Sequence, residues 1–297
     1  RGSGGEGNTP IGSMNMTRIE LHNIKDAIKR ADKASDLSEE TRALRRNAVV
    51  ILKLREALRA IADGGDWESV RRIVSLYKFS AQEDPSKAMR LPQNVLEIDR
   101  AFAEWQYHQV VSALESALNS GSPIGRPGEL DYTEVATREL DEAISKAERA
   151  NVPADRCDEL YRKAMHTRRI RRKLMSLRRD ERLRVIEMAE DAISRRSETP
   201  EILAVLEDQK HLYIVETLSE ALRLPGIRGS VETLTVSVSC IEALRDALSH
   251  VADIECSTRV CQDTIEAAKY ILKLRETVTM EEPDEPYTMS EKWRALH

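Results

Sequence analysis

The chemically most distinctive feature of the 297-residue sequence is a basic run that extends from His166 to Arg184. Between residues 168 and 184 it contains nine Arg or Lys and two acids, a local charge of +7 in a chain whose net charge is −5. Ile170, Leu174 and Leu177 form an apolar stripe along the same predicted helix. A basic amphipathic helix of this kind can bind an acidic protein surface, nucleic-acid phosphates or calmodulin.

We predict that the run binds a protein partner with an acidic surface, such as a tubulin tail or a phosphorylated segment. The competing interpretation is a solvated helix face that acids on the adjacent helix neutralise. Nucleic acid is disfavoured by the acidic net charge and by the lack of interleaved aromatic residues. Calmodulin binding is disfavoured because the apolar stripe aligns with core positions of an internal repeat. The predicted contact residues are Arg168, Arg169, Arg171, Arg172, Lys173, Arg178 and Arg179.

A second candidate docking site lies near the end of the sequence, where Trp293 and Leu296 are close to Arg294. These residues either form a short docking peptide or pack as a helix on the last repeat. At an offset of 220 residues Trp293 aligns with Ile73 and Leu296 with Leu76, which favours the packed helix.

The residue patterns of common catalytic and metal sites do not occur in the sequence. It contains no GxxxxGK[ST] loop, no GxGxxG and no HExxH, and its six histidines are scattered. The closest thiol pair is Cys256-x4-Cys261. On one helix this spacing would turn the two thiols to different faces, so we interpret both as small packing residues. We therefore predict that the protein is not an enzyme and has no catalytic residue, no bound metal and no cofactor.

The composition indicates a reducing environment. The four cysteines do not form a disulfide-like framework. No stretch approaches the ~18 consecutive apolar residues that would span a bilayer. These features predict a cytoplasmic protein without a membrane span.

Helices must position all of these residues, because apolar side chains recur at helical spacing through nearly the whole chain. Helix starts are indicated at Ser38 and at Asp66, and Thr199-Pro200 places proline at a first helical position. The predicted helices are residues 17–33, 38–62, 66–80, 92–119, 130–150, 154–178, 180–195, 200–223, 230–252 and 257–278.

One segment carries two contradictory signals. Residues 231–240, VETLTVSVSC, are rich in β-branched side chains and alternate as a strand does. Val231, Leu234 and Val238 nevertheless continue the helical stripe that follows them. We predict a helix, because an internal repeat pairs this segment with residues 129–140.

The internal repeat is visible when the chain is aligned with itself. The string ILKLRE occurs at Ile51–Glu56 and again at Ile271–Glu276, at an offset of 220 residues. An intermediate copy aligns with the first at an offset of 116 and with the third at 104. Because one copy cannot bury its apolar stripe alone, neighbouring copies must stack. Aligned apolar positions are Ile24, Leu140 and Leu244, followed by Ala27, Ala143 and Ala247.

The repeat predicts an all-α fold, an elongated array of antiparallel helices made of about 2.5 degenerate repeats of 104 to 116 residues. The array is either an α-solenoid or a chain of spectrin-like bundles. The predicted division begins with a disordered leader left from expression at 1–13. Repeat units follow at 14–129 and 130–229, with a partial third unit at 230–280. An acidic proline-containing linker and a short terminal helix occupy 281–297.

The repeat resembles the degenerate helical arrays of large cytoskeletal and flagellar proteins of protists. The features that carry the resemblance are the Ala-Ile-x-x-Ala seam, the Asp-Trp-Glu-Ser-Val start at 66–70 and the Leu-Lys-Leu-Arg-Glu end of the second helix. The resemblance implies a scaffold that mediates protein–protein interaction in a cytoskeleton-associated or cilium-associated assembly. The alternative function is a helical protein that binds nucleic acid or calmodulin through residues 168–184.

Overall fold

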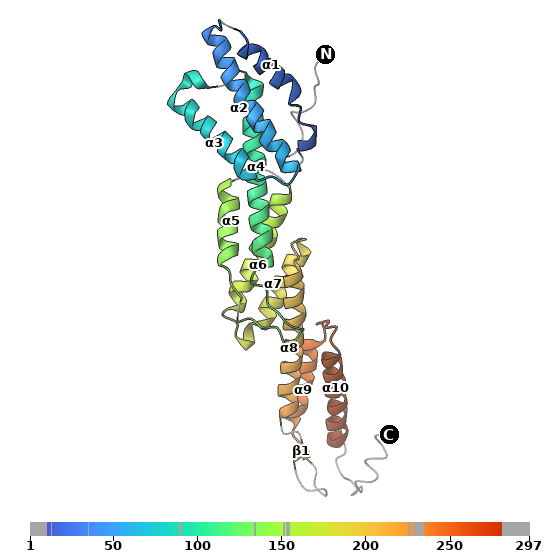
Figure 1. Ribbon diagram of the computed structural model, residues 1–297. Coiled ribbons are helices and arrows are strands. Elements are labelled where there is room, and N and C mark those ends of the chain that lie inside the picture. Colours follow the sequence, from blue (N-terminus) through green and yellow to red (C-terminus); the bar gives the residue numbers. More distant parts are fainter. Residues whose placement is uncertain are drawn as a thin grey trace. The chain divides into compact units, whose positions relative to one another are not determined.

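The computed structural model of the chain describes residues 11–12, 14–34, 36–88, 91–133, 135–150, 152, 155–224, 227–228 and 235–280. Within these ranges the chain is built from α-helices joined by short loops and 3-10 turns, with one two-stranded β-ladder (Figure 1). The predicted all-α class is confirmed. In the described part of the chain every helix is too short or too polar to act as a membrane span.

The chain divides into two compact units. Unit 1 consists of Arg1–Ala117 and Glu139–Ala164, and unit 2 consists of Leu118–Arg138 and Met165–His297. These bounds follow packing and differ from the units predicted from the repeat, so the repeat-based division stays a prediction.

Unit 1 has its core on three helices. Buried side chains of α2, Ile51 and Leu54 among them, pack with Val70 of α3 and with Ile98 and Ala101 of α4. The elements of unit 1 are η2 (Met16–Arg18), α1 (His22–Asp32), α2 (Glu39–Ala62), α3 (Trp67–Glu83), η3 (Pro85–Lys87), α4 (Pro92–Asn119) as far as Ala117, α5 (Arg138–Ala150) and α6 (Asp155–Leu174) as far as Ala164.

In the described part of unit 2, two apolar clusters both involve α8. Ile202 and Val205 in its first half pack with α6 and α7, and Ile214 and Leu218 in its second half pack with α9 and α10. Figure 1 shows α8, α9 and α10 side by side. The elements of unit 2 are the rest of α6, η4 (Arg179–Glu181), α7 (Arg182–Ser194), α8 (Pro200–Arg223), β1 (Ile227–Arg228), β2 (Thr235–Val236), α9 (Val238–Val251) and α10 (Arg259–Met280).

The predicted helix starts are confirmed by their capping bonds. Ser38 Oγ accepts from the backbone N–H of Thr41 at 3.2 Å, and Asp66 Oδ1 accepts from that of Glu68 at 2.9 Å. Thr199 caps α8 ahead of Pro200. Each cap satisfies a backbone donor that the first helical turn leaves without a partner.

Three predicted helices begin at least five residues later than expected. The helix predicted at 17–33 begins at His22, after the 3-10 turn η2. The helix predicted at 130–150 begins at Arg138, and residues up to 133 form a loop in which Ile124 and Asp131 make an isolated antiparallel bridge. The helix predicted at 230–252 begins at Val238, and β2 pairs with β1 ahead of it. In the last case the β-branched composition outweighed the helical stripe at residues 235–236, and residues 231–234, with Val231 and Leu234 of that stripe, lie outside the described residues.

The same arginine contact is made at three points of the chain. Arg55 Nη1 donates to the carbonyl oxygen of Glu20 at 3.2 Å, Arg171 Nη1 to that of Ala136 at 2.9 Å, and Arg275 Nη1 to that of Cys240 at 3.1 Å. In each case the acceptor lies 35 residues before the arginine. The arginines lie on α2, α6 and α10, each of which is the second helix of a pair. Two of the acceptor carbonyls lie just before the first helix of the pair, α1 or α5, and the third lies in the first turn of α9.

Candidate functional site

The predicted basic contact surface includes one arginine that lies in the core of unit 2. The side chain of Arg171 is 1% exposed and makes a bidentate ion pair with Glu201, at 2.8 Å from Nε and 2.7 Å from Nη2. The expectation that Arg171 contacts a partner is therefore wrong. The competing interpretation expected acids of the adjacent helix to neutralise the basic run at a solvated surface. Glu201 of α8 does neutralise Arg171, but this pair is buried inside unit 2.

Most of the other described basic residues of the run are at or near the surface, and Arg182, which is 16% exposed, is paired with Glu216 of α8. Arg169, Arg172 and Arg178 are exposed, and Arg168 is partly buried with its Nη2 3.1 Å from Met165 Sδ. Lys173 is bound to Glu181, which lowers the pKa of that carboxyl. The side chain of Arg179 lies outside the described residues. A basic surface composed of Arg168, Arg169, Arg172 and Arg178 thus stays a prediction.

The apolar stripe of the same segment faces inward. Ile170 and Leu174 are buried in a core cluster of unit 2, and Leu177 packs against that cluster. Capture of this helix in the manner of a calmodulin target would require these side chains to leave the core. The core placement therefore speaks against the calmodulin alternative.

A buried polar network on α8 was not predicted from the sequence. Asp208 is fully buried, and its Oδ1 accepts from the backbone N–H groups of Gly128 at 2.7 Å and Leu130 at 3.3 Å. The Tyr132 hydroxyl donates to Asp208 Oδ2, and burial raises the pKa of Tyr132. These bonds hold the loop before α5 against α8, which explains why residues 130–133 are not helical. A signal was present, because Glu201 and Asp208 are spaced seven residues apart on the apolar stripe of α8.

Unit 1 has a surface groove of about 770 Å³ between α4 and α5. Its lining includes Trp105 and Gln109 of α4 and Asp141 and Lys146 of α5. Lys146 Nζ donates to Gln109 Oε1 at 3.1 Å. The lining combines apolar side chains of both helices with charged side chains of α5.

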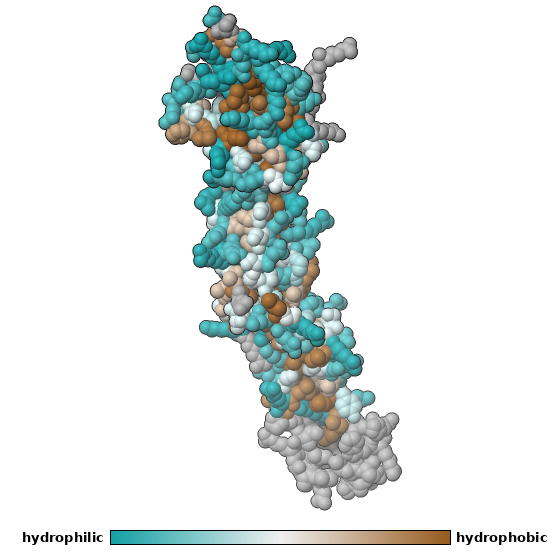
Figure 2. Space-filling model, in the orientation of Figure 1, coloured by the Kyte–Doolittle hydropathy of each residue, from teal (hydrophilic) through white to brown (hydrophobic). Residues whose placement is uncertain are grey.

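Apolar side chains also reach the surface of unit 1. Leu76 and Phe79 of α3 are 62% and 59% exposed. Figure 2 shows apolar patches over α3 on a face that is otherwise mainly hydrophilic. The two side chains are three residues apart and so lie on one face of α3.

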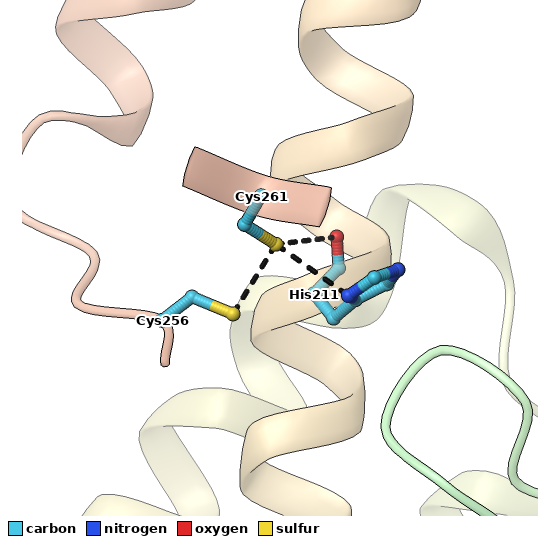
Figure 3. Close-up of side chains that lie close together, drawn as sticks. All are labelled: His211, Cys256 and Cys261. Atoms are coloured by element: carbon cyan, nitrogen blue, oxygen red, sulfur yellow. Dashed lines mark hydrogen bonds between the residues drawn. The ribbon is translucent and has the colours of Figure 1, made fainter. Parts of the chain in front are cut away.

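Three potential metal ligands meet in unit 2 (Figure 3). Cys256 lies in the link between α9 and α10, Cys261 in the first turn of α10, and His211 in α8. Cys261 Sγ is 3.2 Å from Cys256 Sγ and 3.5 Å from His211 Nδ1. The expectation that the two thiols face apart is wrong, because Cys256 precedes the helix that begins at Arg259. Burial raises the pKa of Cys261 to about 12.

The predicted tail residues Trp293 and Leu296, with the whole segment 281–297, lie outside the described residues. Of the predicted disordered leader, Ile11 and Gly12 are described, and Gly12 N–H donates to Glu104 Oε2 at 2.8 Å.

Comparison of the chain with known protein families, with characterised proteins and with solved structures found no match.

Proposed function

We propose that the chain is a non-catalytic helical-repeat scaffold that mediates protein–protein interaction, in a cytoskeleton-associated or flagellar assembly. In a repeat array each repeat packs only on its neighbours, and the array offers a long surface to partners. The proposed repeat unit begins with a pair of helices joined by the arginine contact, which are α1–α2, α5–α6 and α9–α10. In the first two copies a second pair follows, α3–α4 and α7–α8.

The recurring arginine contact is the observation that carries this proposal. Arg55, Arg171 and Arg275 are separated by 116 and 104 residues, which are the offsets at which the sequence copies align. The helices that carry them, α2, α6 and α10, begin at residues separated by the same two intervals. Buried positions recur as well, since the aligned pairs Leu140 and Leu244, and Ala164 and Ala268, are all fully buried.

We place the partner contact on the basic surface of α6 and the segment after it, which consists of the exposed Arg169, Arg172 and Arg178 and the partly buried Arg168. A dense positive charge in a chain of net charge −5 favours an acidic partner and accelerates its association. The buried Arg171 anchors this helix and is not part of the contact.

The test compares two variants with equal change of charge. One carries Arg169→Glu, Arg172→Glu and Arg178→Glu, and the control carries Arg46→Glu, Arg59→Glu and Arg72→Glu, all exposed positions of unit 1. Both variants and the unchanged chain are used for affinity purification from cells with mass spectrometry, after nuclease treatment. We expect the first variant to lose proteins that the control retains. Equal recovery of partners by both would contradict the basic surface as a contact.

Chromatography on a heparin or RNA column distinguishes nucleic-acid binding from the scaffold proposal. A nucleic-acid-binding chain would be retained with a steep dependence on salt, and the first variant alone would lose retention. The scaffold proposal expects weak retention that differs little between the two variants.

A further inference from the structure

The cluster of His211, Cys256 and Cys261 combines donor atoms from two places far apart in the sequence. His211 belongs to α8, and the two cysteines lie about 50 residues later. All three ligand atoms lie within 4.8 Å of one another. In Figure 3 both Cys256 Sγ and His211 Nδ1 face Cys261 Sγ.

Two of the three separations are close to the edges of a zinc coordination tetrahedron, and the third, between Cys256 Sγ and the His211 nitrogen, is at most 4.8 Å. Zn–S bonds of about 2.3 Å and Zn–N bonds of about 2.0–2.1 Å separate two sulfurs by roughly 3.8 Å and a sulfur from a nitrogen by roughly 3.5 Å. The observed Cys261 Sγ to His211 Nδ1 distance is 3.5 Å. The two sulfurs, at 3.2 Å, need to move apart by about 0.6 Å to reach the tetrahedral separation, which the position of Cys256 in the link before α10 permits.

Neighbouring groups already orient the ligands. The backbone at Gly128 approaches the opposite edge of the His211 ring so closely that an added Cβ would lie 2.5 Å from Nε2. Gly128 is held there by Asp208. Thr258 Oγ1 lies 2.9 Å from His211 Nδ1 and 3.3 Å from Cys256 Sγ, and its hydrogen bond to Nδ1 must give way when that nitrogen binds zinc. The packing of Gly128 against the opposite edge keeps the ring in place during this exchange.

We propose that His211, Cys256 and Cys261 form a zinc site in unit 2, with a water molecule at the fourth position. Two thiolates neutralise the charge of the divalent ion, so the bound site is tolerated in a partly buried position. Sulfur and imidazole donors select zinc over magnesium or calcium, which prefer oxygen ligands. The ion would fasten the link between α9 and α10 to α8.

The repeat supplies a matched control. Cys157 in α6 aligns with Cys261 at the offset of 104 residues and is also buried. The residues that align with Cys256 and His211 are Val152 and Tyr107, so the other two ligands are missing from that copy. Cys157→Ser therefore removes a buried thiol without touching the proposed site.

The experiment uses the full chain, reduced and stripped of metal, with zinc added at known concentrations. Bound zinc is counted by elemental analysis, and affinity is measured by competition with a chromophoric chelator. We expect one zinc per chain, and cobalt in its place should give thiolate-to-cobalt charge-transfer absorption with the visible bands of tetrahedral coordination. Cys256→Ser and His211→Ala should each weaken binding by more than about 100-fold, and Cys157→Ser should leave it unchanged.

Thermal unfolding distinguishes a variant that has lost zinc binding from a variant that does not fold. Zinc should raise the unfolding midpoint of the unchanged chain and of Cys157→Ser, but not that of Cys256→Ser, whose altered side chain lies in a partly exposed link. Circular dichroism verifies that the helical content of each variant is kept. The proposal is overturned if the reduced chain does not bind zinc stoichiometrically. Formation of a Cys256–Cys261 disulfide on oxidation would not rescue the proposal in that case. It is also overturned if folded Cys256→Ser or His211→Ala binds zinc as tightly as the unchanged chain.

Discussion

Arg55 in unit 1 and Arg171 in unit 2 make the same hydrogen bonds in different surroundings. Each donates through Nη1 to a carbonyl 35 residues earlier and through Nε and Nη2 to both oxygens of a glutamate on a later helix. The side chains of Arg55 and Glu97 are 30% and 24% exposed, whereas those of Arg171 and Glu201 are 1% and 4% exposed.

The difference shows that geometry alone does not set the contribution of an ion pair. Water near Arg55 weakens the attraction and also hydrates either group when the other is removed. At Arg171 both charged groups are buried. Their desolvation therefore cost free energy on folding, and removing one partner would leave the other charge buried and uncompensated. Identical contacts should therefore have very different effects on stability.

The largest expected effect is that of Arg171→Met. It leaves the buried carboxylate of Glu201 without its cation, and we expect unit 2 to lose about 3–5 kcal/mol of stability. Hydrogen exchange of peptides from α6 and α8 measures this loss locally, because two compact units need not unfold together.

The matched double variant Arg171→Met with Glu201→Leu removes both charges. We expect it to recover most of the loss, since replacing a whole buried pair by apolar groups is often close to neutral. A double variant as unstable as the single one would mean that the contact with Ala136, not the ion pair, is decisive.

Arg55→Met should have a smaller effect, a loss of about 1 kcal/mol. Added salt should reduce the difference between Arg55→Met and the unchanged chain, while leaving the effect of Arg171→Met nearly constant. Urea unfolding at low and high salt measures both. Equal losses at the two positions would refute burial as the cause of the difference between the two ion pairs.

Glu104 extends the comparison to a buried acid that lacks an arginine clamp. It is fully buried in α4, and among the described residues its Oε1 has no hydrogen-bond partner. Burial raises the pKa of Glu104 above its ordinary value of 4.5. The folded state then holds the proton more tightly than the unfolded state, so stability falls as pH rises from 4.5 through the raised pKa.

Glu104→Gln removes this penalty and keeps an acceptor for the Gly12 N–H. We expect a gain of up to about 1 kcal/mol at neutral pH that disappears as the pH falls below the ordinary pKa. Thermal unfolding across this pH range measures the gain. A destabilised variant at neutral pH would show that the carboxylate has a partner that outweighs its burial.

The smallest effect is expected for the exposed arginines of the basic surface. Each of Arg169→Glu, Arg172→Glu and Arg178→Glu should change stability by less than about 0.5 kcal/mol, in contrast to Arg171 in the same segment. Thermal unfolding of the three single variants measures this. A large loss at any of them would assign that residue to the core and not to a contact surface.

Local signals were sufficient for most helices, because their ends depend on nearby residues. Ser38 and Asp66 cap the helices they were expected to begin, and Pro92 and Pro200 begin α4 and α8. The loop at 130–133 was not predicted, because it is held by Asp208, which lies more than 70 residues later.

The site residues were harder to predict for the same reason. Nothing within the basic run distinguishes the buried Arg171 from the exposed Arg172, because the groups that bind Arg171 lie outside the run, Glu201 30 residues later and the Ala136 carbonyl 35 residues earlier. Likewise the two cysteines form a cluster only with His211, 50 residues upstream. Local periodicity predicts which face of a helix is apolar but not which distant charge that face meets.

The bounds of the two units have a consequence for how the protein can be made and divided. The chain leaves unit 1 after Ala117, contributes Leu118–Arg138 to unit 2, and returns to unit 1 at Glu139. No single backbone cut therefore releases either unit whole, and a ribosome must synthesise the chain through Ala164 before unit 1 has all its parts. Separate expression of one unit would require its two segments to be joined or supplied together.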